Sequence, residues 1–454
     1  MENQERVGAE GEQQKLFKPR RGQLPDAERV SVLQGKLYQK AKQERKYKFY
    51  VLYDKIFLPY VLRQAWESVK KNGGSPGIDG QTIEDVGKRG GETFLEELKE
   101  DLRKRTYKPK AVKRVMIPKA NGGERPLGIP TVRDRVAQTA CKMIIEPLFE
   151  ADFEESSHGF RPGRSAKDAM AAIKQHLKEG KTEVLDADLS SYFDTIPHDK
   201  LMIALKERVT DPRVLHLIQL WLKAPVYEDG QFKGGRNNDK GTPQGGVISP
   251  LLANIYLHLL DRIVNNPRGL FNQLGIKMVR YADDFVLLAR EIPKKATLLL
   301  RQLLNRMGLR MNEEKTRLLH VRENSFDFLG FTIRYSRDLH NRNHKYLDIH
   351  PGKKSEKRVR RKISDYLATH GHCSGNVIAQ ELNVIIKGWL NYFDIKGVSY
   401  LAMSRRRLRH YLLDKLRRYY RRKSQRKSNL SGQQAFEKLV HDYGLIDPTK
   451  LCYG

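Results

Sequence analysis

The sequence predicts an α+β protein in which antiparallel hairpins are followed by a basic, helical region. Residues 277–290 place two short runs rich in Val, Leu, Tyr and Phe on either side of the acidic pair Asp283 and Asp284. This pattern is typical of two strands joined by a tight turn. Residues 112–133 repeat it around an Asn-Gly-Gly turn. Beyond residue 353, leucines recur at the spacing of one helix face, so helices should dominate the C-terminal region.

The charge of the chain indicates a polyanionic partner. Its 454 residues include 85 Lys and Arg against 54 Asp and Glu, a net charge of +31, which is more than solubility requires. Residues 353–427 alone hold 21 Lys and Arg against 5 Asp and Glu, a net charge of +16. Such a balance most often indicates nucleic acid. A well-solvated basic surface is the alternative.

Other patterns in the sequence argue against a zinc protein, a disulfide-stabilised protein and a membrane protein. Cys141, Cys373 and Cys452 stand far apart with no CxxC pair, so we expect neither a cysteine-based zinc site nor a disulfide framework. No stretch reaches the apolar length of a membrane span, and the polar N-terminus lacks the apolar core of a signal peptide. We therefore expect a soluble, intracellular protein with no membrane partner.

The N-terminal region is expected to be a mobile polar arm over residues 1–27, followed by a partly helical segment over residues 31–53 in which basic and aromatic residues are interspersed. Basic residues beside aromatic rings suit RNA, because phosphate contacts and stacking faces lie together. A helix that merely packs on the main domain fits the segment equally well. The candidate RNA contacts are Lys40, Lys42, Arg45 and Lys46. Further helices are expected over residues 60–71, 92–105, 199–223 and 293–307.

Two basic loops belong to the first half of the chain. Lys119 and Arg125 flank the turn of the hairpin at residues 112–133, where they could grip phosphates or simply be solvated. The loop of residues 158–165, HGFRPGRS, carries Arg161 and precedes an Ala-rich helix. Both loops are candidates for nucleic-acid contacts.

A strand expected over residues 182–194 carries further acids. Asp186 and Asp188 lie two residues apart, so strand alternation places both on one face and cannot choose between them. The glycine-rich loop of residues 241–250 ends in Ser249, a good helix N-cap. Backbone amides at such a loop and helix start are free to meet a nucleotide.

The last part of the chain adds a polar turn, a hairpin and a helical module. Lys315 lies in the turn of residues 308–317, and residues 326–333 are a further hairpin candidate. The expected core of the basic module includes Trp389, Tyr392 and Phe393. Its candidate nucleic-acid contacts are Arg405, Arg406, Arg407 and Arg409.

The adjacent carboxylates of Asp283 and Asp284 suggest a metal site. Like charges on one turn raise each other's energetic cost, and a divalent cation removes that repulsion. Hard oxygen ligands suit Mg²⁺. An ordinary surface turn is the alternative, which this motif alone does not exclude.

The motifs occur in the order of a known family. They are PGIDG, IPK…RPLGIPT, GFRPGRS, DLSSYFD, TPQGGVISPLLANIYL, YADD, NEEKT and FLGF, from about Tyr60 to Trp389. Together they resemble the reverse transcriptases encoded by bacterial group II introns. QGGVISP, in place of an ending in SQ, points away from diversity-generating elements, and we find neither retron signatures nor an integrase-like domain. No Cys/His-bearing endonuclease module follows, so the resemblance is to the form that lacks this domain, and independent cleavage of a second target strand is not expected.

The resemblance implies a right-hand polymerase with fingers, an antiparallel palm sheet and a helical thumb. The fingers and palm would span residues 60–345, and the basic thumb, or maturase region, residues 350–425. An N-terminal extension over residues 1–59 would precede them. A short C-terminal segment over residues 426–454 would be a possible remnant of a DNA-binding domain.

The resemblance also implies which acids bind metal. The family pattern is an Asp followed five residues later by an aromatic and six residues later by another Asp, which Asp188, Phe193 and Asp194 match. Asp186 is then a structural or supporting acid. Two Mg²⁺ ions, for which Mn²⁺ can substitute, would be held by Asp188, Asp283 and Asp284.

The remaining site residues are implied in the same way. Lys119 and Arg125 would grip the triphosphate, and Gln244 and Gly245 would face the incoming nucleotide and the template. Phe193 would lie against the ribose, where it would exclude a 2′-hydroxyl. The candidate proton donor or phosphate contact near the leaving group is Lys315.

The implied function is RNA-directed DNA polymerisation, in which a primer 3′-hydroxyl is extended with dNTPs on an RNA template by two-metal phosphoryl transfer. Family members also act as maturases, so group II intron RNA, bound as a ribonucleoprotein, and target DNA are implied partners in splicing and retrohoming. The implied location is the bacterial cytoplasm, with nucleoid association when the protein is bound to DNA. One alternative is a free-standing reverse transcriptase that serves DNA repair or phage defence. Another is a splicing factor with a decayed polymerase, against which the intact acids argue.

Overall fold

The computed structural model describes residues 24–118, 123–235, 238–242, 245–337, 345–423, 430 and 434–450. Contacts divide the chain into two compact units. Unit 1 comprises Met1–Asp152 and Met202–Ser249, and unit 2 comprises Phe153–Leu201 and Pro250–Gly454. The domain boundaries implied by the family resemblance, at residues 59, 345 and 425, stay a prediction.

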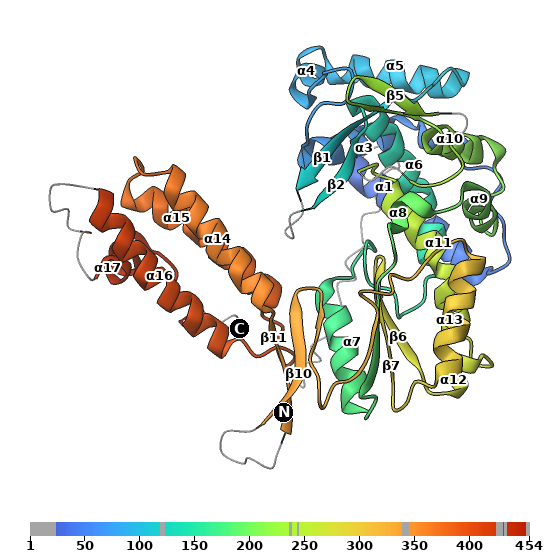
Figure 1. Ribbon diagram of the computed structural model, residues 1–454. Coiled ribbons are helices and arrows are strands. Elements are labelled where there is room, and N and C mark those ends of the chain that lie inside the picture. Colours follow the sequence, from blue (N-terminus) through green and yellow to red (C-terminus); the bar gives the residue numbers. More distant parts are fainter. Residues whose placement is uncertain are drawn as a thin grey trace, which may run out of the picture. The chain divides into compact units, whose positions relative to one another are not determined.

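Unit 1 combines helices with a small sheet (Figure 1). Its helices are α1 (Asp26–Gln43), α2 (Tyr53–Ile56), α3 (Pro59–Asn72), α4 (Ile83–Lys88), α5 (Gly91–Lys104), α6 (Val132–Glu150) and α10 (Pro212–Leu222). Its strands follow the order β2-β1-β4-β5 and are β1 (Val112–Pro118), β2 (Glu124–Ile129), β4 (Pro225–Glu228) and β5 (Gln231–Gly234). Most of α6 is buried, and this helix packs against α1 and α3, so it forms the centre of the unit.

A buried arginine fastens the N-terminal segment of unit 1. Arg208 is 2% exposed and donates to Asp152 Oδ2 at 2.5 Å. It also donates to the carbonyl oxygens of Ala41, Glu44 and Tyr47 at 2.9–3.2 Å. The segment after α1 is therefore held to the body of the unit.

The central sheet of unit 2 is antiparallel, with strand order β6-β7-β3-β8. Its strands are β3 (Glu183–Ala187), β6 (Lys277–Tyr281), β7 (Asp284–Ala289) and β8 (Arg317–His320). One face packs on α7 (Ala166–Lys178), which lies beside β6 and β7 (Figure 1). The buried side chains of α7 include Ala169, Met170 and Ile173. The other helices of this part of unit 2 are α8 (Tyr192–Thr195), α9 (His198–Lys206, which runs into unit 1), α11 (Ser249–Val264), α12 (Leu270–Gln273) and α13 (Lys294–Arg306).

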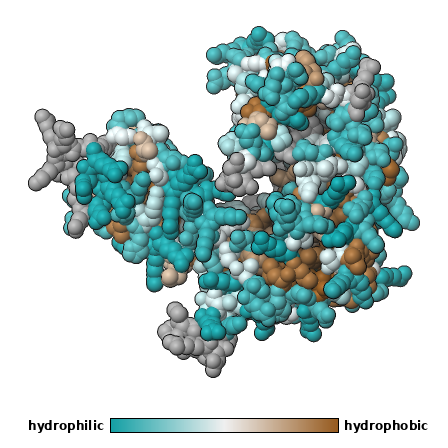
Figure 2. Space-filling view, viewed as in Figure 1, coloured by the Kyte–Doolittle hydropathy of each residue, from teal (hydrophilic) through white to brown (hydrophobic). Residues whose placement is uncertain are grey.

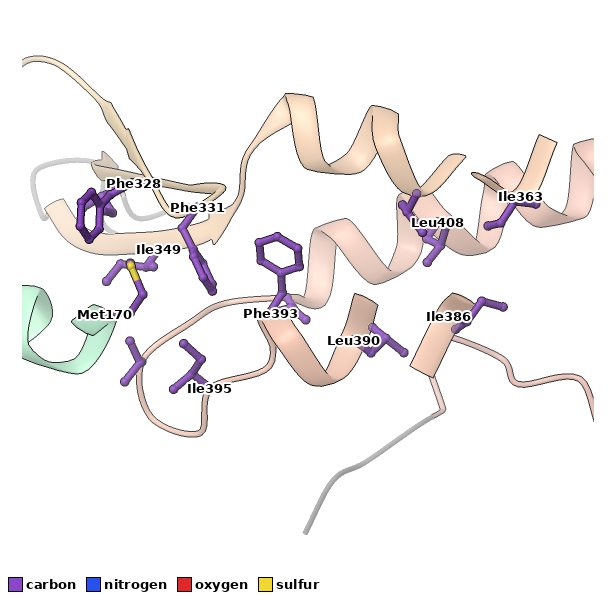
Figure 3. Close-up of a cluster of buried hydrophobic side chains, with 14 of the residues drawn as sticks. Met170, Phe328, Phe331, Ile349, Ile363, Ile386, Leu390, Phe393, Ile395 and Leu408 are labelled. Atoms are coloured by element: carbon purple, nitrogen blue, oxygen red, sulfur yellow. The ribbon is translucent and has the colours of Figure 1, made fainter. Parts of the chain in front are cut away.

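A second sheet joins this part of unit 2 to a helical module. The sheet has the order β11-β10-β9, with β9 (Phe326–Phe328), β10 (Phe331–Arg337) and β11 (Lys345–Pro351). The module contains α14 (Lys353–Thr369), α15 (Gly375–Phe393), α16 (Ala402–Lys423) and α17 (Ala435–Tyr443). Figure 3 shows one apolar core that runs from Met170 of α7 past Phe328 and Phe331 to Leu390 and Leu408. Burial of these side chains gives the module a folded interior despite its charge.

The outer surface of the module is largely hydrophilic in Figure 2. Phe393 is buried as expected, but Tyr392 is 42% exposed, so only part of the predicted aromatic core lies inside. None of the described helices is long and apolar enough to cross a membrane.

Most expected elements are present. The helices predicted over residues 60–71, 92–105 and 293–307 are confirmed as α3, α5 and α13, and the hairpin at residues 277–290 as β6 and β7. The arm predicted for residues 1–27 falls outside the described residues up to residue 23, and α1 begins at Asp26. The strand predicted over residues 182–194 is wrong in length. It ends at Ala187, because the backbone then turns through a left-handed Ser191 into α8.

Candidate active site

The acidic turn closes a two-residue hairpin. Tyr281 pairs with Asp284, which leaves Ala282 and Asp283 as the loop. Ala282 has φ +59°, the left-handed conformation that two-residue hairpins require and that costs a non-glycine residue free energy. The loop after α6 passes so close that a Cβ on Gly159 would lie 2.3 Å from the Ala282 nitrogen. Only glycine allows this approach, so the turn is supported from behind by backbone.

Strand register brings Asp188 to the same end of the sheet. The pairing of β3 with β7 ends at Ala187 and Phe285, so Asp188 directly follows the end of β3, and Asp284 is the first residue of β7. The charge of Asp188 acts on both Asp283 and Asp284, so the three carboxylates lie near one another. Asp186 instead lies within β3, opposite Val286 and Arg317.

The carboxylates perturb one another. Partial burial of the Asp284 carboxyl, together with the charges of Asp283, Asp188 and Asp186, raises the pKa of Asp284 to about 7, although the residue as a whole is exposed. Burial also raises the pKa of Asp283, and the charge of Asp188 adds to this effect. Burial, with the charge of Asp188, raises the pKa of Asp186 to about 6. The site therefore holds more negative charge than its surroundings compensate.

The polar turn before β8 supplies a cation. Lys315 Nζ donates to Asp188 Oδ2 at 3.0 Å. The turn is docked beside the acids by backbone bonds, from the Asn312 amide to the Asp188 carbonyl at 2.8 Å and from the Ser190 amide to the Arg310 carbonyl at 2.9 Å. Lys315 thus lies beside Asp188, and its role as a proton donor or phosphate contact near the leaving group stays a prediction.

The donor chemistry fits a divalent cation. The side chains at the turn offer carboxylate oxygens, the ligands that Mg²⁺ prefers. Burial, and after it the charges of neighbouring carboxylates, raises the pKa of Asp283 and of Asp284, and a bound cation would offset both effects. Within the described ranges, no three His, Cys, Asp or Glu side chains are already gathered closely enough to hold a metal. The carboxylates would have to converge when an ion binds.

Phe193 lies on α8, a few residues after Asp188. Its ring is half-buried and meets the Tyr192 ring edge-on at 5.5 Å between centroids. Tyr192 is buried and donates from its hydroxyl to the Ala253 carbonyl at 2.6 Å. Tyr192 therefore anchors α8, and Phe193 keeps part of its ring accessible.

The predicted nucleotide contacts outside this sheet are only partly described. Lys119 and Gln244 lie outside the described residues. Arg125 is exposed on β2, opposite Ile117. Gly245 has φ +107°, and a Cβ there would lie 2.1 Å from the Gly128 carbonyl oxygen, so the loop requires glycine at this position. The nucleotide-binding roles of all four stay predictions.

Several basic candidates have structural partners. Arg161 is buried and donates to the carbonyls of Glu154 and Ser157 at 2.7 Å each, with its guanidinium over the Phe153 ring. In unit 1, Lys42 donates to the Ala151 carbonyl at 3.0 Å, and Lys40 pairs with Glu44. Arg45 and Lys46 are exposed.

The arginines predicted to bind nucleic acid on α16 also meet acids. Arg405 pairs with Asp394, Arg407 with Glu356 at 3.4 Å, and Arg409 with Asp447 at 3.0 Å. Arg406 is exposed. These pairs reduce the charge that the α16 face presents, and the nucleic-acid role of the four arginines stays a prediction.

A different basic surface, missed by sequence reasoning, lies on α14. Lys354, Arg358 and Lys362 recur every four residues, so they share one face of the helix. They line a groove of about 770 Å³ whose other wall includes Trp389 and Tyr392 of α15. In the described part of the chain none of the three cations forms an ion pair, whereas Arg360 and Arg361 on the same helix pair with Glu356 and Asp365. Their spacing was the signal that could have found them. We name these three residues the α14 stripe.

Comparison with known families matches two segments of the chain. Residues 117–333 match the reverse transcriptase (RNA-dependent DNA polymerase) family. Residues 356–436 match the maturase-specific domain of group II introns. The first match contains the acidic site, and the second contains most of the helical module.

Individual proteins are similar over much of the same region. Protein YkfC of Escherichia coli (strain K12) is 36% identical over 297 residues, which cover 58% of this chain and 77% of that protein. The group II intron-encoded protein LtrA of Lactococcus lactis subsp. cremoris is 30% identical over 349 residues, covering 63% of this chain and 57% of LtrA. An uncharacterised 91 kDa protein in the cob intron of Schizosaccharomyces pombe is 32% identical over 53% of this chain and 30% of its own length. The chain thus spans less than two thirds of the latter two relatives.

Proposed function

Because the chain belongs to the family of group II intron-encoded reverse transcriptases and maturases, its class is RNA-directed DNA polymerase, and we propose that it extends a primer on an RNA template at the Asp188–Asp284 end of the palm sheet. The observation that carries this proposal is the strand register, which sets Asp188 beside the Asp283–Asp284 turn. Polymerisation requires negative oxygen ligands at one point, and two separate parts of the chain supply them here.

The chain's own groups hold and balance charge at this point. Asp188, Asp283 and Asp284 are the proposed metal ligands, and Lys315 offers a cation that exchanges between Asp188 and a phosphate. Reverse transcriptases generally depend on divalent metal ions, and we assign Mg²⁺, with Mn²⁺ as a substitute. When bound, the ions would activate the primer hydroxyl and neutralise the departing pyrophosphate. Lys119, Arg125, Gln244 and Gly245 keep their proposed contacts to the nucleotide and template.

The helical module is proposed to grip nucleic acid through the α14 stripe. Its three cations lack acidic partners among the described residues, and the groove they line has an aromatic wall. When an unpaired Lys or Arg side chain neutralises a phosphate, the nucleic acid releases the counterion bound there, and this release favours binding to the backbone. The half-buried Trp389 and the exposed Tyr392 add apolar surface for sugars and bases.

A maturase role is proposed for the same module together with the basic-aromatic segment of residues 36–53, which comprises the end of α1 and the chain that follows it. The match to the maturase-specific domain supports it, as does the similarity to LtrA. The proposed partners are group II intron RNA, bound as a ribonucleoprotein, and target DNA, in the bacterial cytoplasm and on the nucleoid. The comparisons do not favour the free-standing reverse transcriptase over this reading.

Two variants separate primer extension from the promotion of splicing. The double variant Asp283→Ala/Asp284→Ala changes only residues of the acidic turn, so it should still promote splicing of its cognate intron at low Mg²⁺ while it makes no cDNA. Arg45→Ala/Lys46→Ala should do the reverse, since both side chains are exposed and a simple primer–template does not need them. Lys42 is left unchanged because it holds the Ala151 carbonyl. Primer extension and in vitro splicing are measured on both variants.

One outcome would contradict the maturase role, and another would contradict the polymerase role. If wild-type protein binds its flanking RNA no better than unrelated RNA of equal length, the maturase role fails and the free-standing polymerase replaces it. If wild-type protein extends no primer in Mg²⁺ or Mn²⁺, the polymerase role fails.

A further inference from the structure

A fully buried arginine lies directly behind the acidic turn. Arg280, on β6, is 0% exposed, and each of its five N–H groups has an acceptor. Its Nε and one Nη2 hydrogen go to Asp261, which is also 0% exposed. The second Nη2 hydrogen goes to Ser157 Oγ at 2.7 Å. The Nη1 hydrogens go to Asn254 Oδ1 at 2.9 Å and to the Ala282 carbonyl oxygen at 2.8 Å.

The hydrogen bond from Arg280 to the Ala282 carbonyl oxygen is the one that links Arg280 to the acidic turn. The Ala282 carbonyl belongs to the peptide plane that also contains the Asp283 nitrogen and Cα, because peptide bonds are planar. A guanidinium that fixes this oxygen therefore fixes the plane from which the Asp283 side chain departs. Ala282 needs such support, since its left-handed φ is unfavourable for a residue with a Cβ.

The same network clamps the neighbouring loop. The Arg280 amide donates to the Ser156 carbonyl at 2.8 Å, and the His158 amide donates to the Arg280 carbonyl at 2.9 Å. Asn254, which accepts from Arg280, also donates to the Gly159 carbonyl at 2.8 Å. Gly159 is the residue pressed against the Ala282 nitrogen. The turn is thus held by the arginine on one side and by backbone on the other.

Stability alone does not account for this arrangement. A buried ion pair pays a large desolvation penalty, and well-packed apolar residues of similar volume are often equally or more stabilising. An apolar pair would fill the space of Arg280 and Asp261 but would leave the Ala282 carbonyl without its side-chain donor. The feature that only the guanidinium provides is the fork that spans Asp261 and Ala282 at once.

We propose that Arg280 is a positioning residue that aims the Asp283 carboxylate at the metal site by holding the Ala282 carbonyl, with Asp261 as its buried counterion. The proposal rests on the proposed polymerase function. It predicts that metal affinity and the rate of the chemical step depend on Arg280, and that primer–template affinity does not.

The experiment compares three variants with wild type. Arg280→Lys keeps the charge beside Asp261 but has a single nitrogen, so it cannot span both partners. Arg280→Met/Asp261→Met removes both charges and avoids an uncompensated Asp261. Arg208→Lys is the control, because Arg208 is a buried, multiply bonded arginine of unit 1. Each is measured for thermal stability, Mn²⁺ binding by electron paramagnetic resonance, single-nucleotide incorporation and primer–template affinity.

Both Arg280 variants should bind Mn²⁺ about tenfold more weakly, as expected when a supporting contact to a metal ligand is lost. The maximal incorporation rate should fall about 100-fold, the cost of a small misplacement of a reacting group. Primer–template affinity should stay unchanged. Arg208→Lys should lower stability and leave Mn²⁺ affinity and the maximal rate as in wild type.

The proposal is overturned if the folded double-Met variant keeps wild-type Mn²⁺ affinity and rate. Should that variant not fold, the same result from Arg280→Lys overturns it equally. The proposal is also overturned if Arg208→Lys loses as much Mn²⁺ affinity and incorporation rate as the Arg280 variants. The losses would then be a general consequence of destabilisation. If wild-type protein binds Mn²⁺ but extends no primer, the polymerase function fails, while Mn²⁺ binding still decides the role of Arg280.

Discussion

Lys315 Nζ lies 3.0 Å from Asp188 Oδ2 and donates a hydrogen bond to it. The ammonium thus neutralises a proposed metal ligand, although its side chain is 65% exposed. A cation bound to this carboxylate must compete with Lys315. The same flexible side chain can turn to a phosphate once the carboxylate is occupied.

Replacing Lys315 by Gln should therefore have two opposite effects. The Mg²⁺ concentration for half-maximal activity should fall by a few-fold, because the competitor is removed and an exposed pair is worth about 1 kcal/mol or less. The maximal incorporation rate should also fall, because a phosphate contact is lost. A Mg²⁺ titration of single-nucleotide incorporation measures both. An increased Mg²⁺ requirement would show that Lys315 does not compete with the ion.

Asp283→Asn should abolish cDNA synthesis on a primed RNA template. The amide removes a negative metal ligand while it keeps the size of the side chain, so transition-state stabilisation is lost and duplex contacts are not. We expect a rate loss of at least about a hundredfold with template binding nearly intact. Primer extension and filter binding check this. A variant whose rate stays within about tenfold of wild type would mean that Asp283 is not a metal ligand.

Phe193→Ala should allow ribonucleotides to be incorporated. The half-buried ring on α8 lies close in sequence to Asp188, where it would clash with a ribose 2′-hydroxyl. We expect the preference for dNTPs over rNTPs to fall by about tenfold or more. Thermal denaturation serves as the control, because loss of a packed Phe can destabilise the palm. Unchanged sugar selectivity in a stable, active variant would remove Phe193 from the nucleotide site.

Binding to a primer–template should weaken steeply as salt concentration rises. Replacing the α14 stripe by glutamine should reduce the slope of log K against log salt by about 3, since each phosphate contact contributes about 0.9. The matched comparison replaces Arg405, Arg406, Arg407 and Arg409. Three of these four are paired with acids, so we expect a smaller change in slope. An unchanged slope in the α14 variant would show that the groove does not contact the backbone.

Acid should destabilise the protein partly through His158. Its imidazole is 4% exposed, and among the described residues neither ring nitrogen has a hydrogen-bond partner. Burial, with the charges of Arg164 and Arg161, lowers the pKa of His158 from 6.5 to about 4. The unfolded chain therefore binds a proton that the folded chain rejects, and stability falls as pH drops from about 6.5 to about 4.

When pH falls from 7.5 to 4.5, the free energy of unfolding should decrease less in His158→Asn than in wild type, by up to about 3 kcal/mol. Urea denaturation at pH 7.5 and pH 4.5 measures the difference in the free energy of unfolding. His441→Gln is the control, because the His441 side chain is 91% exposed. Equal acid sensitivity in wild type and His158→Asn would mean that His158 titrates normally in the folded protein.

The local features of this protein could be predicted from the amino-acid sequence alone. The hairpin around Asp283 and Asp284 was predictable, because strand composition and turn residues act over a few positions. The helices α3, α5 and α13 followed from the spacing of apolar residues in the same way. The order of the motifs indicated the family, and comparison with known proteins confirmed it.

Contacts between charged groups could not be predicted in the same way, because they depend on how distant segments pack together. Alternation could not choose between Asp186 and Asp188, the family resemblance pointed to Asp188, and in the structure Asp188 directly follows β3 beside the turn. No local pattern marks Arg280 as buried, because its partners Asp261 and Ser157 lie 19 and 123 residues away. The arginines of α16 and the α14 stripe look equally basic in sequence, but acids from distant segments neutralise most of the former. Charge pairing is a property of three-dimensional proximity, which composition along the chain does not record.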